Sequence, residues 1–142
     1  MPQIKRYHLP TEAQEQTLLF LWAAAQECVH PELRLMLHVP NGGSRNAREA
    51  KNLKAQGVKP GVPDIFLPVA RHGCNGLWIE MKRQKGGVVS KAQKQWFSDL
   101  ASEGYFTAVC KGADEAIKTI LWYLGGMLEN ETYRRRCADM DL

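Results

Sequence analysis

The sequence of 142 residues has no uninterrupted apolar stretch of about 18 residues, which is the length that a membrane-spanning helix requires. Its start, MPQIKRYHLPTEAQ, also lacks the apolar run of a secretion signal. We therefore expect no membrane association and a location in the cytoplasm. Because 44% of the residues are hydrophobic, the chain can bury one ordinary core, and we expect a single domain.

The four cysteines, Cys28, Cys74, Cys110 and Cys137, contain no pair with CxxC spacing, which argues against a zinc ribbon. In a reducing compartment we expect them to be thiols rather than disulfides. Cys28 and Cys110 lie in apolar runs, so we expect both of these side chains in the core.

Several motifs of other functional classes are also missing. The sequence has no P-loop, no dinucleotide-binding fingerprint and no nucleophile elbow, which disfavours the enzyme classes that depend on them. It has no helix-turn-helix or zinc finger with which to read bases. The net charge of +4 arises from 19 basic and 15 acidic residues, and it is compatible with a polyanionic partner without requiring one.

The apolar periodicity predicts a layered α/β domain with a mixed central sheet flanked by helices. Thr11 and Ser90 are good N-caps for the first and third helices. In the first helix we expect Leu18, Leu19, Trp22 and Ala23 to be buried. We expect helices over residues 11–29, 46–56, 91–103 and 114–124, and strands over 34–40, 64–69, 76–82 and 105–110. The core then covers about 12–124 of the domain 1–142, and 125–142 form a C-terminal extension.

Two apolar runs, DIFLPV and GLWIEMK, each carry a carboxylate near a strand end, namely Asp64 and Glu80. Burying a carboxylate there is costly unless something satisfies it, and a shared divalent cation with oxygen ligands would do so. Because side chains alternate along a strand, Glu80 and Lys82 point to one face and Met81 to the other. An ammonium group beside a metal-bound water would orient or help deprotonate this nucleophile.

A simpler interpretation of the same residues is structural. Asp64 follows Pro63 and could cap a turn, while Glu80 and Lys82 could form an ion pair at the end of a strand. Short patterns of acids and lysines are frequent, so the pattern alone leaves both interpretations open.

The wider sequence resembles the VRR-NUC nucleases of the PD-(D/E)XK superfamily, in particular the short stand-alone members of phages and bacteria. The resemblance is carried by PNGGSRN, LKAQGVKPGVPDIFLPV, GLWIEMKR, GGVVSKAQKQWFSDL and GYFTAVCKGADEAI. It also includes the proline that precedes the aspartate, Pro63. The resemblance implies a restriction-endonuclease-like core in a bacterial or phage-infected cell.

The resemblance also implies roles for individual residues. Asp64 and Glu80 would be metal-binding carboxylates, and Met81 would contribute its main-chain carbonyl. Lys82 would be the catalytic lysine. Gln93, on the following helix, would support Lys82 or the attacking water.

The family brings one further acidic ligand from its first helix, and two candidates exist here. Glu12 stands four residues before Gln16, as in the family pattern E-x-x-x-Q, and is preferred. Glu15 is the alternative, because Leu19 and Trp22 follow it on the same helical face.

Basic and glycine-rich segments provide candidate DNA contacts. The turn containing Asn41, Gly42, Gly43 and Arg45 has free backbone N–H groups that can contact phosphate, although an ordinary β-turn would look the same. Basic residues continue at intervals of three along the next helix, which is typical of either a solvated face or a stripe that follows DNA phosphates. These residues are Arg48, Lys51 and Lys54, and Arg83 flanks the proposed metal site.

We therefore expect a Mg²⁺- or Mn²⁺-dependent endonuclease that recognises branched DNA by shape rather than by sequence. The short family members resemble junction-resolving homodimers, and a two-fold dimer matches the symmetry of a four-way (Holliday) junction. The alternatives are a flap or nicking nuclease of phage DNA replication or repair, and a DNA-binding module without catalysis.

Overall fold

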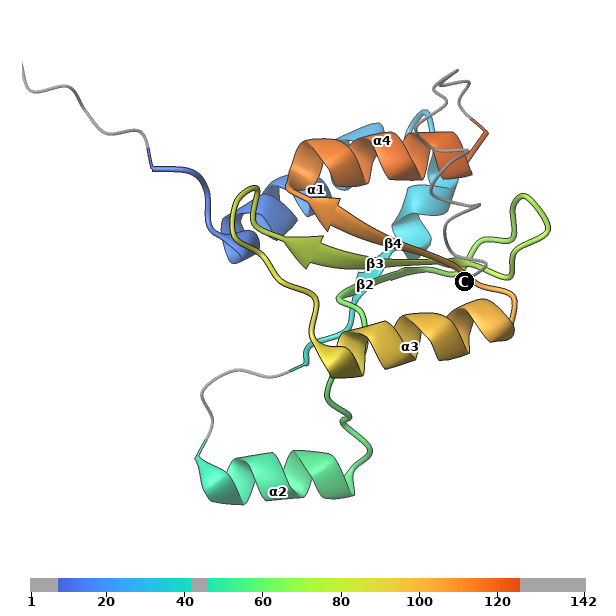
Figure 1. Cartoon of the computed structure of the whole chain (residues 1–142). Coiled ribbons are helices and arrows are strands. Elements are labelled where there is room, and N and C mark those ends of the chain that lie inside the picture. Colours follow the sequence, from blue (N-terminus) through green and yellow to red (C-terminus); the bar gives the residue numbers. More distant parts are fainter. Residues whose placement is uncertain (1–7, 42–45, 126–142) are drawn as a thin grey trace, which may run out of the picture.

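The computed structural model describes residues 8–41 and 46–125, which form one α/β domain (Figure 1). Its centre is a four-stranded sheet in the order β1-β2-β3-β4. The strands are β1 (Leu37–His38), β2 (Ile65–Leu67), β3 (Leu77–Lys82) and β4 (Phe106–Lys111). The predicted mixed sheet is therefore confirmed, with the strands next to Asp64 and Glu80 at its centre.

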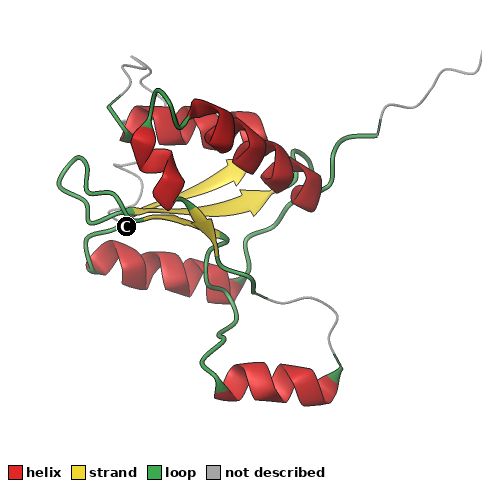
Figure 2. Ribbon diagram, turned by 180° about the vertical axis from the view of Figure 1, so that it is seen from behind, coloured by secondary structure: helices red, strands yellow, loops and turns green. Residues whose placement is uncertain are grey.

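The connections explain why the sheet is mixed. β2 runs antiparallel to both β1 and β3, whereas β4 pairs parallel to β3. A parallel neighbour requires a crossover, and α3 (Lys91–Ser102) lies between β3 and β4 in the chain. The crossover places α3 on one face of the sheet, while α1 (Glu12–Gln26) and α4 (Ala113–Tyr123) cover the other (Figures 1 and 2).

The two faces of β3 have different chemistry because successive side chains point in opposite directions. Leu77, Ile79 and Met81 are at most 1% exposed and belong to the hydrophobic core. The alternate residues include Glu80 and Lys82, which are also buried but are charged. The polar side chains at the end of β3 therefore share the face that α3 covers.

The structure corrects the expected strand over 34–40. Residues Pro31–Leu35 form a 3₁₀ helix, and only Leu37–His38 pair with β2. Proline is favoured at the first position of a helix, where its missing N–H costs nothing. The 3₁₀ helix buries the side chain of Leu33. This packing holds residues 31–35 in a helical conformation rather than in an extended strand.

Two predicted core positions near the first helix are wrong. Leu18 is 50% exposed, and Cys28 is exposed, whereas Cys110 is buried as expected. The buried face of α1 is formed by Glu15, Leu19 and Ala23, at intervals of four residues. Leu18 lies off this face, and Cys28 follows the helix end at Gln26. Trp22, also predicted to be buried, is only half-buried.

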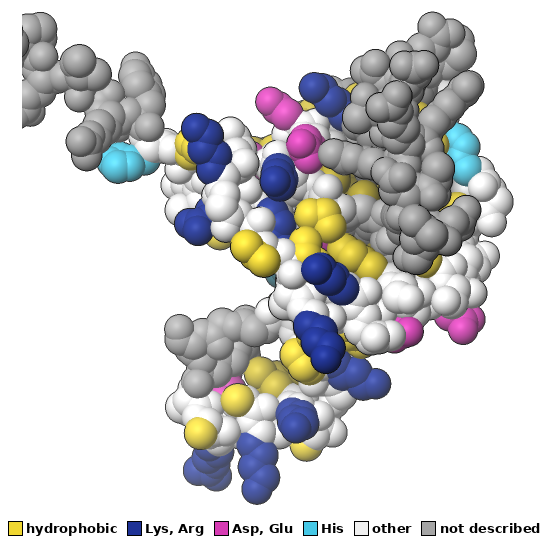
Figure 3. Space-filling view, in the orientation of Figure 1, with side chains coloured by type: hydrophobic (Ala, Val, Ile, Leu, Met, Phe, Trp, Pro, Cys, Tyr) yellow, Lys and Arg dark blue, Asp and Glu magenta, His cyan; other side chains and the backbone are white. Residues whose placement is uncertain are grey.

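Helix α2 (Ala47–Ala55) stands away from the sheet in Figure 1, and Figure 3 shows a hollow between α2 and the rest of the molecule. None of its residues is buried by any part of the chain that the structure describes. Asn46 caps the helix by accepting a hydrogen bond from the Glu49 N–H. Within the described residues, no helix has the length and apolar character needed to cross a membrane.

Candidate active site

Asp64 and Glu80 lie next to each other at one end of the central strands. Ile65 pairs with Ile79, so Asp64, just before β2, lies close to the end of β3. The Met81 N–H donates a hydrogen bond to Asp64 Oδ2 over 2.8 Å. This bond fixes the Asp64 side chain across the two strands, while the Met81 side chain remains in the core.

Glu80 is the most buried acidic group of the site, at 2% exposure. Its Oε1 atom lies 3.0 Å from Lys82 Nζ and also accepts a hydrogen bond from Gln93 Nε2. Its Oε2 atom is buried and has no hydrogen-bond partner among the described residues. Two side chains thus hold one oxygen of this carboxylate, and none of the described residues satisfies the other.

The two carboxyl groups affect each other's pKa in opposite directions: the charge of Asp64 disfavours ionisation of Glu80, whereas the contact with Glu80 lowers the pKa of Asp64. Burial and, next, the charge of Asp64 raise the pKa of Glu80 to about 7, although Lys82 opposes this shift. Burial also raises the pKa of Asp64, against the lowering effects of the Met81 N–H, His38 and Lys82. A cation between the two groups would relieve both the burial cost and the repulsion.

The chemistry of these donors fits a hard divalent cation. Such an ion takes carboxylate and carbonyl oxygens, and Mg²⁺ typically keeps several waters and binds through one or two carboxylates and a substrate phosphate. Among the described residues there is no cluster of three or more His, Cys, Asp or Glu side chains that could hold a metal. The Asp64 and Glu80 carboxylates and the Met81 carbonyl are oxygen donors of the kind that Mg²⁺ and Mn²⁺ take.

Gln93 is fixed by its place at the start of α3. Its Oε1 atom accepts a hydrogen bond from the Ser90 N–H over 2.8 Å, and its own N–H donates to the Ser90 hydroxyl. The two bonds form a capping box, of which the sequence analysis predicted the Ser90 N-cap but not the part played by Gln93. The box leaves the Gln93 amide nitrogen available to contact Glu80. The amide contacts the same Glu80 oxygen as Lys82, so the two side chains hold the carboxylate together.

Glycines bring the surrounding loops close to the site. A Cβ atom on Gly61 would lie 2.7 Å from the backbone of Ala92, in the first turn of α3. A Cβ atom on Gly87 would lie 2.8 Å from Lys82 Cβ. The loop before Asp64 and the loop after β3 therefore contact these elements through bare backbone, which only glycine permits.

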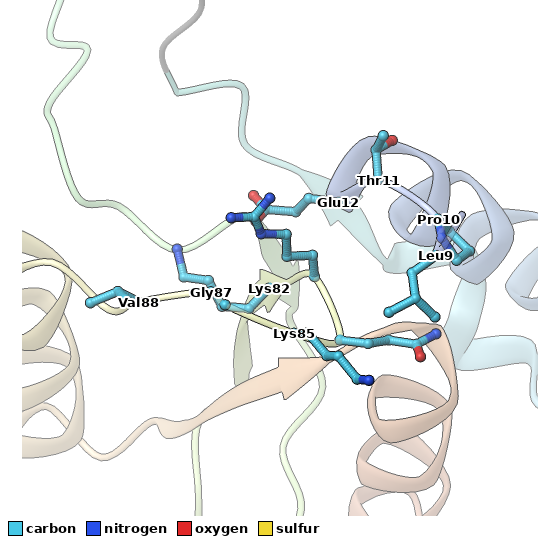
Figure 4. A pocket seen from close by; sticks show the side chains of 11 residues that line it. Leu9, Pro10, Thr11, Glu12, Lys82, Lys85, Gly87 and Val88 are labelled. Atoms are coloured by element: carbon cyan, nitrogen blue, oxygen red, sulfur yellow. The ribbon is translucent and has the colours of Figure 1, made fainter. Parts of the chain in front are cut away.

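The structure separates the two glutamates of the first helix. Glu15 is 3% exposed, and its oxygens accept hydrogen bonds from Gln84 Nε2 (2.6 Å) and the Ala113 N–H (2.7 Å). It therefore caps the N-terminus of α4, where a negative charge is favourable. Glu12 is exposed and lines a cavity together with Lys82 (Figure 4). Its charge contributes slightly to the raised pKa of Glu80.

The predicted DNA contacts are dispersed. Arg83 lies directly after β3 and lines the same cavity as Glu12. Arg48 and Lys54 are exposed on α2. Asn41 donates a hydrogen bond to the Val62 carbonyl and so supports the loop before Asp64. Gly42, Gly43 and Arg45 lie outside the described residues.

Sequence reasoning did not identify two polar neighbours of the site. His38 Nδ1 lies 2.7 Å from the Asp64 carbonyl oxygen, and the histidine charge lowers the pKa of Asp64. Gln84 holds Glu15 from the residue just beyond Arg83. Neither position carries a spacing signal, because both contacts depend on how distant segments meet.

The sequence model of the VRR-NUC domain matches residues 11–114. The chain belongs to the VRR-NUC family. A solved structure described as a VRR-NUC domain protein is 34% identical and superimposes with a TM-score of 0.71, covering 83% of this chain and 93% of that one. Among curated proteins, none matches significantly.

Membership of the VRR-NUC family confirms the expected nuclease-like α/β fold. A VRR-NUC domain is a nuclease-type domain, so the class of substrate is DNA. The residues gathered around Glu80 lie within the matched range 11–114.

Proposed function

We propose that this VRR-NUC protein is a Mg²⁺- or Mn²⁺-dependent endonuclease that cuts branched DNA and resolves four-way junctions as a homodimer. The observation that carries the proposal is the Asp64–Glu80 carboxylate pair beside the ammonium group of Lys82. One buried Glu80 oxygen of this pair has no hydrogen-bond partner among the described residues. If the Glu80–Lys82 ion pair served only stability, the nearby Asp64 carboxylate would be unfavourable, because its charge raises the pKa of Glu80.

Asp64, Glu80 and the Met81 carbonyl would hold the cation. The described residues do not already bring a third acidic side chain to this pair, so Glu12 would join from α1 only when the cation binds. When bound, the cation would act as a Lewis acid toward the scissile phosphate and would lower the pKa of a bound water. Glu12 is preferred over Glu15 because both oxygens of Glu15 already accept hydrogen bonds within the fold.

The side chains of the protein then position the reaction. Lys82 orients the water that attacks the phosphorus in line, and its positive charge stabilises the charge that develops on the phosphate as the 3′-oxygen leaves. Glu80 holds the Lys82 ammonium, and Gln93 holds Glu80. The rigid capping box at Ser90 therefore supports the orientation of the catalytic lysine through two contacts.

Exposed basic side chains would bind the DNA backbone. Arg83 lines the cavity beside Lys82, and Arg48 and Lys54 are exposed on α2. The segment 41–45, for which the sequence predicts a turn, would add backbone contacts. Such contacts read phosphates rather than bases, so we expect binding that depends on DNA shape and falls steeply with salt.

The proposed homodimer follows from the symmetry of the substrate. A four-way junction presents two equivalent phosphates, and two copies related by a two-fold axis would present two equivalent catalytic sites to them. The reaction would take place in the cytoplasm of a bacterial or phage-infected cell.

A cleavage assay tests this proposal. Linear duplex, single strand, 5′ flap and four-way junction would be incubated with Mg²⁺ or Mn²⁺, with Asp64→Ala as the inactive control. We expect symmetric paired cuts in the junction that chelation of the metal abolishes. If only the flap were cut, the proposed substrate would be wrong and the proposed catalytic site would stand. If no metal-dependent cleavage occurred, Asp64, Glu80 and Lys82 would have only a structural role.

A further inference from the structure

A cavity of about 670 Å³ opens directly beside Lys82. Leu9 and Pro10, before α1, line one side, and residues 85–88, between β3 and α3, line the other (Figure 4). Lys82 and Arg83 also line this cavity. The cavity is thus continuous with the proposed catalytic site, and its volume lies within the ~300–1,000 Å³ typical of small-ligand sites.

The walls of this cavity combine apolar and cationic groups with one acidic side chain, Glu12, which the proposed function assigns to the cation. Val88 is 80% exposed and Leu9 is 49% exposed, so both leave a large apolar side chain in water. Arg83 and Lys85 contribute positive charge within the same lining. A nucleotide has matching parts, because its base has apolar faces and its phosphate is anionic. A ligand with only one of these parts would leave the other half of the lining unused.

The loop that forms one wall comes close to the catalytic residues. Gly86 has φ +76, and a Cβ atom there would lie 3.4 Å from the Arg83 guanidinium. Gly87 contacts Lys82 through bare backbone. A nucleotide in the cavity would therefore lie next to the phosphate at Lys82. Inside a duplex the base is stacked and paired, so it would reach these walls only after leaving the helix.

We infer that this cavity binds an unpaired nucleotide of the cleaved strand, immediately beside the scissile phosphate. The inference rests on the proposed nuclease function and explains how a site without base-reading residues selects branched DNA. Extruding a paired base costs a few kcal/mol, whereas a base at a branch point or mismatch is extruded at lower cost. Cleavage is consequently fastest where the nucleotide next to the cut is already unpaired.

The test is single-turnover cleavage of one branched DNA in matched forms. After the cut position is mapped, the nucleotide on each side of the cut is either paired or mismatched by changing only the opposite strand. We expect a mismatch on one side to accelerate cleavage about tenfold or more, since each factor of ten corresponds to about 1.4 kcal/mol of unpairing cost removed. A mismatch two turns away serves as the control substrate.

Substitutions of the apolar residues Val88 and Leu9 test whether the acceleration by a mismatch depends on the cavity. Val88→Ser and Leu9→Ser should reduce the ratio of mismatched to paired cleavage rates at least threefold. Val29→Ser is the matched control, because Val29 is 64% exposed and does not line the cavity. Placing 2-aminopurine at the same nucleotide, with the Asp64→Ala protein bound, should increase fluorescence as the base leaves the stack.

Two results are distinguishable. Metal-dependent cleavage that proceeds at one rate on paired and mismatched forms, with Val88→Ser behaving like Val29→Ser, would overturn this inference and leave the nuclease function intact. Absence of any metal-dependent cleavage would overturn the proposed function and the inference together.

Discussion

Replacing Glu80 by glutamine should remove a pH dependence of stability that this buried carboxyl creates in metal-free protein. The pKa of Glu80 is raised from its ordinary value of 4.5 to about 7, mainly by burial and then by Asp64. Between about pH 5 and pH 8 the folded protein releases a proton that the unfolded chain has already lost. The free energy of unfolding of the wild type therefore falls as the pH rises through this range.

The magnitude follows from the shift. At about 1.4 kcal/mol per pKa unit, a change from 4.5 to about 7 corresponds to roughly 2.5 kcal/mol between about pH 5 and pH 8. Glutamine has nearly the same shape as glutamate and no charge. We expect the wild type to lose about 2 kcal/mol more stability than Glu80→Gln between these two pH values.

The assay is urea denaturation at the two pH values in the presence of EDTA. Glu103→Gln provides a matched control, because Glu103 is exposed at the end of α3. The difference in the free energy of unfolding between Glu103→Gln and the wild type should be the same at both pH values within a few tenths of a kcal/mol. If the difference between the wild type and Glu80→Gln were the same at both pH values, the argument that burial and Asp64 oppose ionisation of Glu80 would be refuted.

Three further changes test the support of the site and the DNA contacts. Gly87→Ala places a methyl group against Lys82. In steady-state cleavage it should lower kcat about tenfold or more with little change in KM, and an unchanged kcat would contradict the close contact of Gly87 with Lys82. Glu15→Ala leaves the Ala113 N–H unpaired and should lower the midpoint of thermal unfolding, at a cost of about 2 kcal/mol, whereas the exposed Glu27→Ala should not. Combined Arg48→Gln and Lys54→Gln should reduce the slope of log affinity against log salt by about 2, measured by fluorescence anisotropy; an unchanged slope would exclude α2 from the interface.

The amino-acid sequence was sufficient to predict the elements that depend on local interactions. Thr11 and Ser90 were recognisable N-caps because capping uses residues within one helical turn. Alternation along GLWIEMK placed Glu80 and Lys82 on one face, and the two atoms that meet lie 3.0 Å apart. The VRR-NUC resemblance added the order of the carboxylates, the lysine and Gln93 along the chain.

Only the tertiary structure decided which partners these residues have. Glu12 and Glu15 are one helical turn apart and chemically alike, and they are distinguished by Ala113, which lies 98 residues after Glu15. The contact between His38 and Asp64 depends on the pairing of β1 with β2, and that of Gln93 with Glu80 on the packing of α3 against the sheet. The raised pKa of Glu80 arises in the same way, because burial and the approach of a second carboxylate exist only after distant segments of the chain have met.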